Sequence, residues 1–115
     1  MESWTVIFYQ TLRGEEPVKE FIDKLEIKQQ AKIYSHLGLL KQYGLNLPST
    51  YLKKLSGTKK LWELRVGSWR IFLSPVAQKN ILLIHMIIKK SNKTPKKDLK
   101  LSQNRLQDFL KGGLS

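Results

Sequence analysis

The spacing of apolar residues divides the first half of the chain into one strand and two helices. Residues 4–9 are rich in aromatic and β-branched side chains, which is typical of a β-strand. Pro17 suits the first turn of a helix. The apolar stripe of that helix comprises Val18, Phe21, Ile22 and Leu25, and a second stripe comprises Ile33, Leu37 and Leu40. The second stripe predicts a helix over residues 27–43 that stops at Gly44, and the two helices together predict a helical hairpin.

The second half of the chain predicts three consecutive strands. Residues 44–60 combine glycines, a proline and lysines, which favours a loop with room for a short helical turn. Residues 61–66 and 69–74 predict two strands joined by a tight turn at Gly67-Ser68. A second turn leads to residues 81–88, whose continuous apolar character predicts a strand buried on both faces, centrally in the sheet.

A final helix completes the predicted order β-α-α-β-β-β-α. Thr94 supplies a capping hydroxyl, Pro95 takes the first helical position, and Gly112-Gly113 end the helix. One face of this helix comprises Leu99, Leu106, Phe109 and Leu110. We therefore expect an α+β fold, with a small, mainly antiparallel sheet of about four strands packed against the N-terminal helical hairpin, and with a C-terminal helix. Residues 1–115 are predicted to form a single domain.

Composition indicates where such a protein works. Of the 115 residues, 41% are hydrophobic and none is cysteine, so packing must hold the domain together and a reducing compartment suits it. The N-terminus carries an acid and no basic segment, so no secretion signal is expected. The longest apolar run, residues 81–88, is too short to span a bilayer. We expect a soluble, cytoplasmic protein with no membrane partner.

The charge is concentrated in one part of the chain. The formal net charge is +12, and residues 1–26 hold three basic and six acidic side chains. Residues 27–115 hold eighteen basic and three acidic ones. Such a basic excess favours a polyanion, because neutralising phosphates releases condensed counterions. The alternative is a lysine-rich surface that only keeps the protein soluble.

Several classes of chemistry find no support in the residues. The two histidines, His36 and His85, are far apart and no cysteine is present, so no metal and no cofactor is predicted. No glycine-rich phosphate loop follows a strand, and no serine occupies a nucleophile elbow. His85 is expected to pack in the core, and His36 to lie on the surface. Trp62 and Trp69 fit either stacking on RNA bases or packing against the helices.

Two basic stretches remain as candidate sites. In the hairpin, Glu63 and Arg65 share one face of a strand, and Arg70 follows on the next strand, which makes a compact anion site. The alternative is that Arg65 only pairs with Glu63. Between the last strand and the last helix lie five lysines, namely Lys89, Lys90, Lys93, Lys96 and Lys97. A helix N-terminus also favours anions, although a solvated run of charges would look the same.

These stretches form a motif with several parts. The parts are, in order, Leu61-Trp62-Glu63-Leu64-Arg65, Arg70-Ile71-Phe72, His85, Lys89-Lys90 and Lys93-Thr94-Pro95. In this order and spacing they resemble the RelE/ParE toxin superfamily, and within it the phage-derived HigB-like branch. The resemblance implies a type II toxin that acts as a ribosome-dependent endoribonuclease and cuts mRNA in the ribosomal A site. It also implies a cognate antitoxin, commonly a helix-turn-helix protein, through which the complex binds DNA indirectly.

The resemblance also implies roles for particular residues. Arg70 corresponds to the arginine that opens a strand of the family motif, and Arg65 to the arginine that ends the preceding strand. Both are assigned to the phosphate and to transition-state charge. Lys89 and Lys90 stand near the basic position after the last strand, and they complete the predicted catalytic set. The predicted RNA-binding residues are Lys54, Lys93, Lys96 and Lys97, and Lys93 is a further candidate for proton transfer.

The chain departs from its relatives at some positions. Leu61 and Glu63 stand where some relatives have lysines, and the C-terminal tyrosine of the best-known RelE-type sites is missing. The general base therefore stays open: Glu63 fits that role, but it also fits an ion pair with Arg65. Two other functions remain, a ParE-like gyrase inhibitor and a basic module that binds nucleic acid without cutting it.

Overall fold

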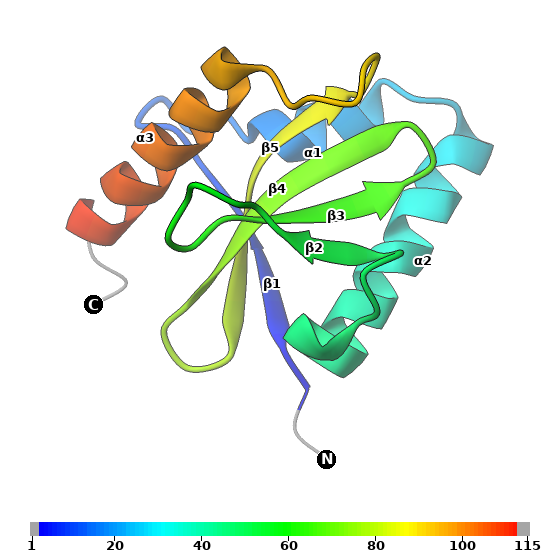
Figure 1. Cartoon of the computed structure of the whole chain (residues 1–115), viewed down its shortest axis with the longest axis horizontal. Helices are drawn as coiled ribbons and strands as arrows, with labels where there is room; N and C mark the ends of the chain where they lie inside the picture. Colours follow the sequence, from blue (N-terminus) through cyan, green and yellow to red (C-terminus); the bar gives the residue numbers. More distant parts are fainter. Residues whose placement is uncertain (1–2, 113–115) are drawn as a thin grey trace.

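One five-stranded sheet carries helices on both of its faces (Figure 1). The computed structural model describes residues 3–112, so Met1, Glu2 and the predicted helix-ending Gly113 lie outside it. The elements are, in order, β1 (Thr5–Phe8), α1 (Pro17–Asp23), α2 (Ile27–Tyr43), the 3₁₀ turn η1 (Gly44–Asn46), β2 (Leu52–Lys54), β3 (Trp62–Val66), β4 (Trp69–Val76), β5 (Asn80–Ile88) and α3 (Lys96–Gly112). This α+β architecture confirms the predicted fold class.

The sheet has the strand order β1-β5-β4-β3-β2. Strands β2 to β5 pair antiparallel, whereas β1 pairs parallel with β5, so the sheet is mainly antiparallel as predicted. Strand β5 lies between β1 and β4, and four consecutive side chains, Ile81 to Ile84, are fully buried. The continuous apolar run therefore marks a strand that is covered on both faces.

Strand β2 corrects the predicted strand number, which omitted it. It lies within residues 44–60, where a loop was predicted, and the short helical turn allowed there is η1. Only Leu52 of the three β2 residues is buried, while Lys53 and Lys54 are exposed. A strand this short has too few residues to display an alternating pattern. Charged side chains suit its place at the edge of the sheet, because they discourage pairing with another chain.

Helices α1 and α2 cover one face of the sheet. Their buried residues are Val18, Ile22, Ile33, Leu37 and Leu40, which are members of the two predicted stripes. Residues 24–26 join the helices, so the two follow each other directly, as the hairpin prediction requires. Gly44 adopts a φ of 58° where α2 ends, a conformation that glycine tolerates better than other residues. These helices and the sheet enclose the larger core.

Helix α3 lies on the opposite face and covers only part of it. It begins at Lys96, one residue later than predicted, and buries Leu106 against Leu61, Leu82 and Ile84. The same face carries Arg65 and Arg70 beyond the helix, with side chains that are partly exposed. No helix within residues 3–112 is long and apolar enough to cross a membrane. The uncovered part of this face is where the predicted cations gather.

Candidate nucleic-acid site

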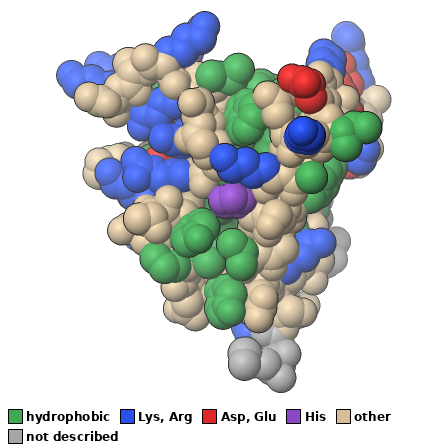
Figure 2. Space-filling model, turned by 90° about the vertical axis from the view of Figure 1, so that its right-hand side faces the viewer, with side chains coloured by type: hydrophobic (Ala, Val, Ile, Leu, Met, Phe, Trp, Pro, Cys, Tyr) green, Lys and Arg blue, Asp and Glu red, His purple; other side chains and the backbone are tan. Residues whose placement is uncertain are grey.

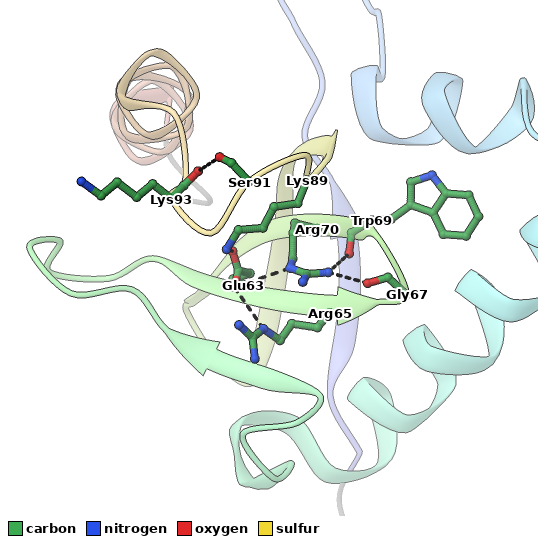
Figure 3. Close-up of polar contacts among 8 residues, drawn as sticks. All are labelled: Glu63, Arg65, Gly67, Trp69, Arg70, Lys89, Ser91 and Lys93. Atoms are coloured by element: carbon green, nitrogen blue, oxygen red, sulfur yellow. Dashed lines mark hydrogen bonds and ion pairs between the residues drawn. The ribbon is translucent and has the colours of Figure 1, made fainter.

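Three cationic side chains surround one buried carboxylate on the open part of the sheet (Figure 3). Glu63 Oε2 lies 3.3 Å from Arg65 Nε and 3.8 Å from Arg70 Nε, and Glu63 Oε1 lies 3.9 Å from Lys89 Nζ. We call these four residues the Glu63 cluster. The ion pair between Arg65 and Glu63 that the sequence allowed is present, but it is one of three contacts to the same carboxylate.

The pairing of the strands brings the Glu63 cluster together. Glu63 and Arg65 lie two residues apart on β3, so they share one face. Arg70 is directly opposite Arg65 across the β3–β4 hairpin, and Lys89 follows the last residue of β5. The backbone N–H of Lys89 donates to the Ser68 carbonyl at 2.7 Å, which holds the strand end against the hairpin turn. Residues that are 26 positions apart in sequence, Glu63 and Lys89, thus meet.

The charges in the Glu63 cluster are not balanced. One carboxylate serves three cations, so two positive charges have no carboxylate of their own within the cluster. Glu63 is only 1% exposed, whereas the side chains of Lys89, Arg70 and Arg65 are 13%, 15% and 33% exposed. The carboxylate is therefore shielded, and the cations form the surface that a ligand meets.

Two buried atoms in the Glu63 cluster lack hydrogen-bond partners. They are Glu63 Oε1 and Arg70 Nε. Arg70 Nη1, by contrast, donates to the carbonyls of Gly67 at 2.7 Å and Trp69 at 2.9 Å, which fixes the guanidinium plane on the turn. Both atoms are buried inside the cluster, where Arg70 Nε lies 3.8 Å from Glu63 Oε2, so neither is open to a ligand. The guanidinium of Arg70 is nevertheless held in place on the turn, and the fork of an arginine suits the oxygens of a phosphate.

Two adjoining hollows contain most of the predicted site residues. The first, of about 340 Å³, is lined by Arg65, Arg70, Lys89 and Lys90, together with Gly67, Ser68, Ser91 and Asn92. The second, of about 440 Å³, shares Lys89, Lys90 and Ser91 with the first and adds Lys93 and Lys97. Seen from the α2 side, Lys and Arg side chains gather along one edge of the molecule (Figure 2). Six of the eight predicted residues thus meet in one basic surface.

Two predicted residues lie elsewhere. Lys96 faces a separate groove between α3 and the loop before β3. Lys54 is opposite Trp62 in the β2–β3 ladder, and Trp62 packs on the core under α1 and α2. Residues directly opposite each other point to the same face. Lys54 therefore points away from the Glu63 cluster, and Lys53, which is opposite Glu63, is the β2 lysine on the cluster side.

A second polar network lies on the same sheet face, under α3. His85 Nε2 lies 2.8 Å from Asp98 Oδ1, and the Tyr9 hydroxyl donates to Asp108 Oδ2 at 2.9 Å. Arg105 Nη1 donates to the Ile84 carbonyl at 3.0 Å and lies 3.4 Å from His85 Nδ1. Because Arg105 can only donate, Nδ1 accepts and the His85 Nε2–H donates to Asp98. We call these residues the α3 clasp.

The surroundings of the histidines and tryptophans show what these side chains do in the fold. His85 is largely buried and stacks on Phe72 with ring centroids 5.9 Å apart, so its role in the structure is packing and hydrogen bonding. Trp62 and Trp69 pack on the core under α1 and α2, which favours packing over base stacking. His36 lies beside Tyr51, with ring centroids 5.6 Å apart. Within residues 3–112, no group of three or more His, Cys, Asp or Glu side chains is arranged to hold a metal ion.

Burial raises the pKa of the Tyr9 phenol above its ordinary value of 10.0, and the hydrogen bond to Asp108 raises it further. Its hydroxyl therefore stays protonated and continues to donate throughout the neutral range. Sequence reasoning missed Tyr9, Asp98, Arg105 and Asp108, because nothing in their local pattern signals a contact. Tyr9 and Asp108 lie 99 positions apart and meet only in the folded chain.

The fold is that of the RelE-like proteins. A chain of the archaeal RelE–RelB complex from Pyrococcus horikoshii OT3 superposes with a TM-score of 0.57 and 19% sequence identity, over 82% of this chain and 100% of that chain. The sequence itself assigns the family: the model of the family described as phage derived protein Gp49-like matches residues 20–107, and the chain belongs to that family. Comparison with curated protein sequences gives no match. These findings confirm the resemblance to the RelE/ParE superfamily that the motif predicted.

Proposed function

We propose that the protein is the toxin of a type II toxin–antitoxin system and that it cleaves mRNA on the ribosome. The observation that carries this proposal is the Glu63 cluster, where three cations face solvent around a shielded carboxylate. The family and the RelE-like fold support the same reading. A gyrase inhibitor requires no such concentration of cations at one strand end. A module that binds nucleic acid without cutting it would use the same cations and would leave the mRNA intact.

The proposed reaction is cleavage of RNA by its own 2′-hydroxyl. The 2′-oxygen attacks the adjacent phosphorus, a base accepts the 2′-proton, and the bond to the 5′-oxygen of the next nucleotide breaks as that oxygen gains a proton. The products are a 2′,3′-cyclic phosphate and a free 5′-hydroxyl. Negative charge accumulates on the phosphate oxygens during the attack, so fixed cations lower the barrier.

In this mechanism Arg70 and Arg65 bind the reacting phosphate. Arg70 is held by the hairpin turn and lines the first hollow, so its guanidinium is pre-organised for a phosphate oxygen. One fixed donor of this kind is worth about 10²- to 10³-fold in rate. Lys89 and Lys90 stand at the same hollow and are assigned to proton transfer or to RNA contact, while Lys93 and Lys97 extend the track along the strand end.

Glu63 is assigned to positioning rather than to proton transfer. Its carboxylate is 1% exposed and lies behind the cations, so a substrate hydroxyl does not reach it. A single buried negative charge between three cations reduces their mutual repulsion and fixes their separation. The general base is then one of the lysines of the hollow or a group supplied by the ribosome.

Partners follow from the same proposal. The toxin would act on mRNA bound to the ribosome, in the cytoplasm, and would be neutralised by a cognate antitoxin, commonly a helix-turn-helix protein. The structural neighbour from Pyrococcus horikoshii was determined as a RelE–RelB complex. Contact with DNA would pass through the antitoxin. No cofactor takes part in the proposed chemistry.

The purified protein with a defined mRNA, assayed with and without ribosomes, tests the proposal. We expect cleavage within the open reading frame only when ribosomes occupy it, with 5′-hydroxyl ends on the downstream fragments. If cleavage proceeded equally without ribosomes, the protein would be a nuclease, but its proposed dependence on the ribosome would be wrong. Intact mRNA together with inhibition of DNA gyrase would replace the proposal with the ParE-like function.

A further inference from the structure

A groove beside α3 is lined by leucines and lysines that have no role in the proposed cleavage of mRNA. It has a volume of about 930 Å³ and lies between residues 56–61, which precede β3, and one side of α3. Its floor holds leucines from both walls, among them Leu61, Leu99 and Leu106, and its rim holds Lys59, Lys60, Lys96 and Lys100. We call it the α3 groove. None of the Glu63 cluster residues lines it.

The lysines of the α3 groove have no carboxylate nearby. Within residues 3–112, no acidic side chain lies within ion-pair distance of these four lysines. The three acids of residues 27–115 are all engaged elsewhere: Glu63 by the cations of its cluster, Asp98 by His85 and Asp108 by Tyr9. Residues 3–112 supply no carboxylate to this rim, so its four positive charges are available to an anionic partner.

The floor of the α3 groove favours a peptide over RNA. No aromatic side chain lines the groove, so RNA bases would find no stacking surface. Leu99 is half-buried and Leu110 is 46% exposed, and both lie on the groove side of α3. Leucines seven and eleven positions apart, such as Leu99, Leu106 and Leu110, make a continuous apolar stripe along a helix. Leu106 is only 7% exposed, so apolar side chains of a partner would pack mainly on Leu99 and Leu110.

The dimensions suit a helix. From Lys96 to Leu110 the groove follows fourteen residue steps of α3, or about 21 Å, which equals about fourteen residues of a second helix. The opposite wall is preformed: the Thr58 hydroxyl donates to the Leu55 carbonyl at 2.9 Å, and the Leu55 N–H donates to the Leu61 carbonyl at 3.0 Å. A preformed groove binds without first having to order its own loop.

We propose that the α3 groove binds an acidic, amphipathic helix of a partner protein. The apolar face of that helix packs on the leucines, and its carboxylates pair with the lysines on either rim. In the toxin–antitoxin system proposed above, this segment would belong to the antitoxin, and in that respect the inference rests on the proposed function. The Glu63 cluster lines no part of this groove, so the proposed helix site and the candidate nucleic-acid site share no residue.

Binding of a synthetic peptide to the whole protein tests this inference. The probe is a helical peptide of about 18 residues with leucines at i, i+3, i+4 and i+7 spacing and glutamates elsewhere, and its control has glutamines for the glutamates. We expect the acidic peptide to change the amide NMR signals of Gly57, Lys59 and Gln103, and to leave those of Arg70 and Lys89 unchanged. The glutamine peptide should bind about tenfold more weakly.

Paired variants locate the site. Lys59→Glu combined with Lys100→Glu should weaken binding of the acidic peptide about tenfold. The control is Lys28→Glu combined with Lys41→Glu, at exposed positions of α2. It changes the net charge by the same amount and should leave binding of the peptide unchanged. The inference is overturned if no peptide binds at about 1 mM, or if both double variants weaken binding equally. It is also overturned if a short single-stranded RNA occupies the groove in preference to the peptide. None of these readouts depends on mRNA cleavage, so each can succeed where the nuclease assay fails.

Discussion

The two polar clusters on one sheet face use charge in opposite ways. In the α3 clasp, the contacts of His85 to Asp98 and of Tyr9 to Asp108 are 2.8 and 2.9 Å long. In the Glu63 cluster, the three ion pairs are 3.3 to 3.9 Å long, and two buried atoms have no hydrogen-bond partner. The clasp is satisfied and holds α3 on the sheet. The Glu63 cluster has three cations to one carboxylate, and this excess of positive charge favours an anionic ligand.

The largest effect is expected from Arg70→Ala. Arg70 is a cation that the hairpin turn holds in place at the first hollow, so its loss should lower the rate of mRNA cleavage on ribosomes about 10²- to 10³-fold. Arg13→Ala, in an exposed loop on the N-terminal side of α1, removes the same side chain and should leave the rate unchanged. Thermal unfolding of both variants shows whether they are folded. Equal activity of the two folded variants would remove Arg70 from the site.

The α3 clasp should give the opposite result, a loss of stability with little direct loss of chemistry. Asp98→Ala leaves the buried His85 Nε2–H without its acceptor, which costs about 1–3 kcal/mol. Urea unfolding measures this change. Asp23→Ala, which removes an exposed i,i+4 ion pair with Lys19, should lower the stability much less than Asp98→Ala does. If Asp98→Ala lowered the cleavage rate more than Arg70→Ala at a temperature where both are folded, the division between the clusters would be wrong.

Glu63→Gln separates positioning from binding. The amide keeps the shape but removes the negative charge between three cations, so the local positive charge rises. We expect tighter RNA binding together with about a tenfold lower kcat, because the cations are no longer held at fixed separations. If Glu63 had a purely structural role, Glu63→Gln would lower the stability and leave both the RNA affinity and the kcat of the folded protein unchanged. Glu63→Asp, which keeps the charge, should recover part of kcat.

The smallest effect concerns Tyr9 at high pH. Since its pKa is raised in the folded protein, the unfolded chain loses the phenolic proton first. The stability that the protonated phenol contributes is therefore complete below pH 10.0 and is lost as pH rises from there through the raised pKa. Urea unfolding between about pH 8 and pH 11 should show a decline that is weaker in Tyr9→Phe. Identical slopes would mean that Tyr9 does not contribute to it.

Much of the fold could be predicted because its elements are long enough to show a period. Helix α2 matches its predicted bounds, and β5 is buried on both faces as its apolar run indicated. Strand β2 could not be found in this way, since only Leu52 of its three residues is apolar. Lys53 and Lys54 are adjacent in this strand and point to opposite faces, so only the register with β3 tells which of the two lies on the side of the Glu63 cluster.

The candidate site was predictable where strand alternation decides it. Glu63, Arg65 and Arg70 were expected on one face, and the register of β3 with β4 places them there. The meeting of Glu63 with Lys89, and the contacts of Asp98, Arg105 and Asp108, depend on how β5 and α3 pack in three dimensions. No local pattern encodes these contacts. The unsatisfied atoms of Glu63 and Arg70 are likewise a property of the packed structure.

The central claim is that the Glu63 cluster cleaves mRNA. The most direct measurement is a map of the 5′ ends of cellular mRNA after induction of the wild-type chain, with Arg70→Ala and Arg13→Ala induced in parallel. The account predicts cuts in translated messages, in phase with codons, for the wild type and Arg13→Ala, and their loss in Arg70→Ala. Intact mRNA with damaged DNA in the wild type, or the same cuts in Arg70→Ala, would contradict it.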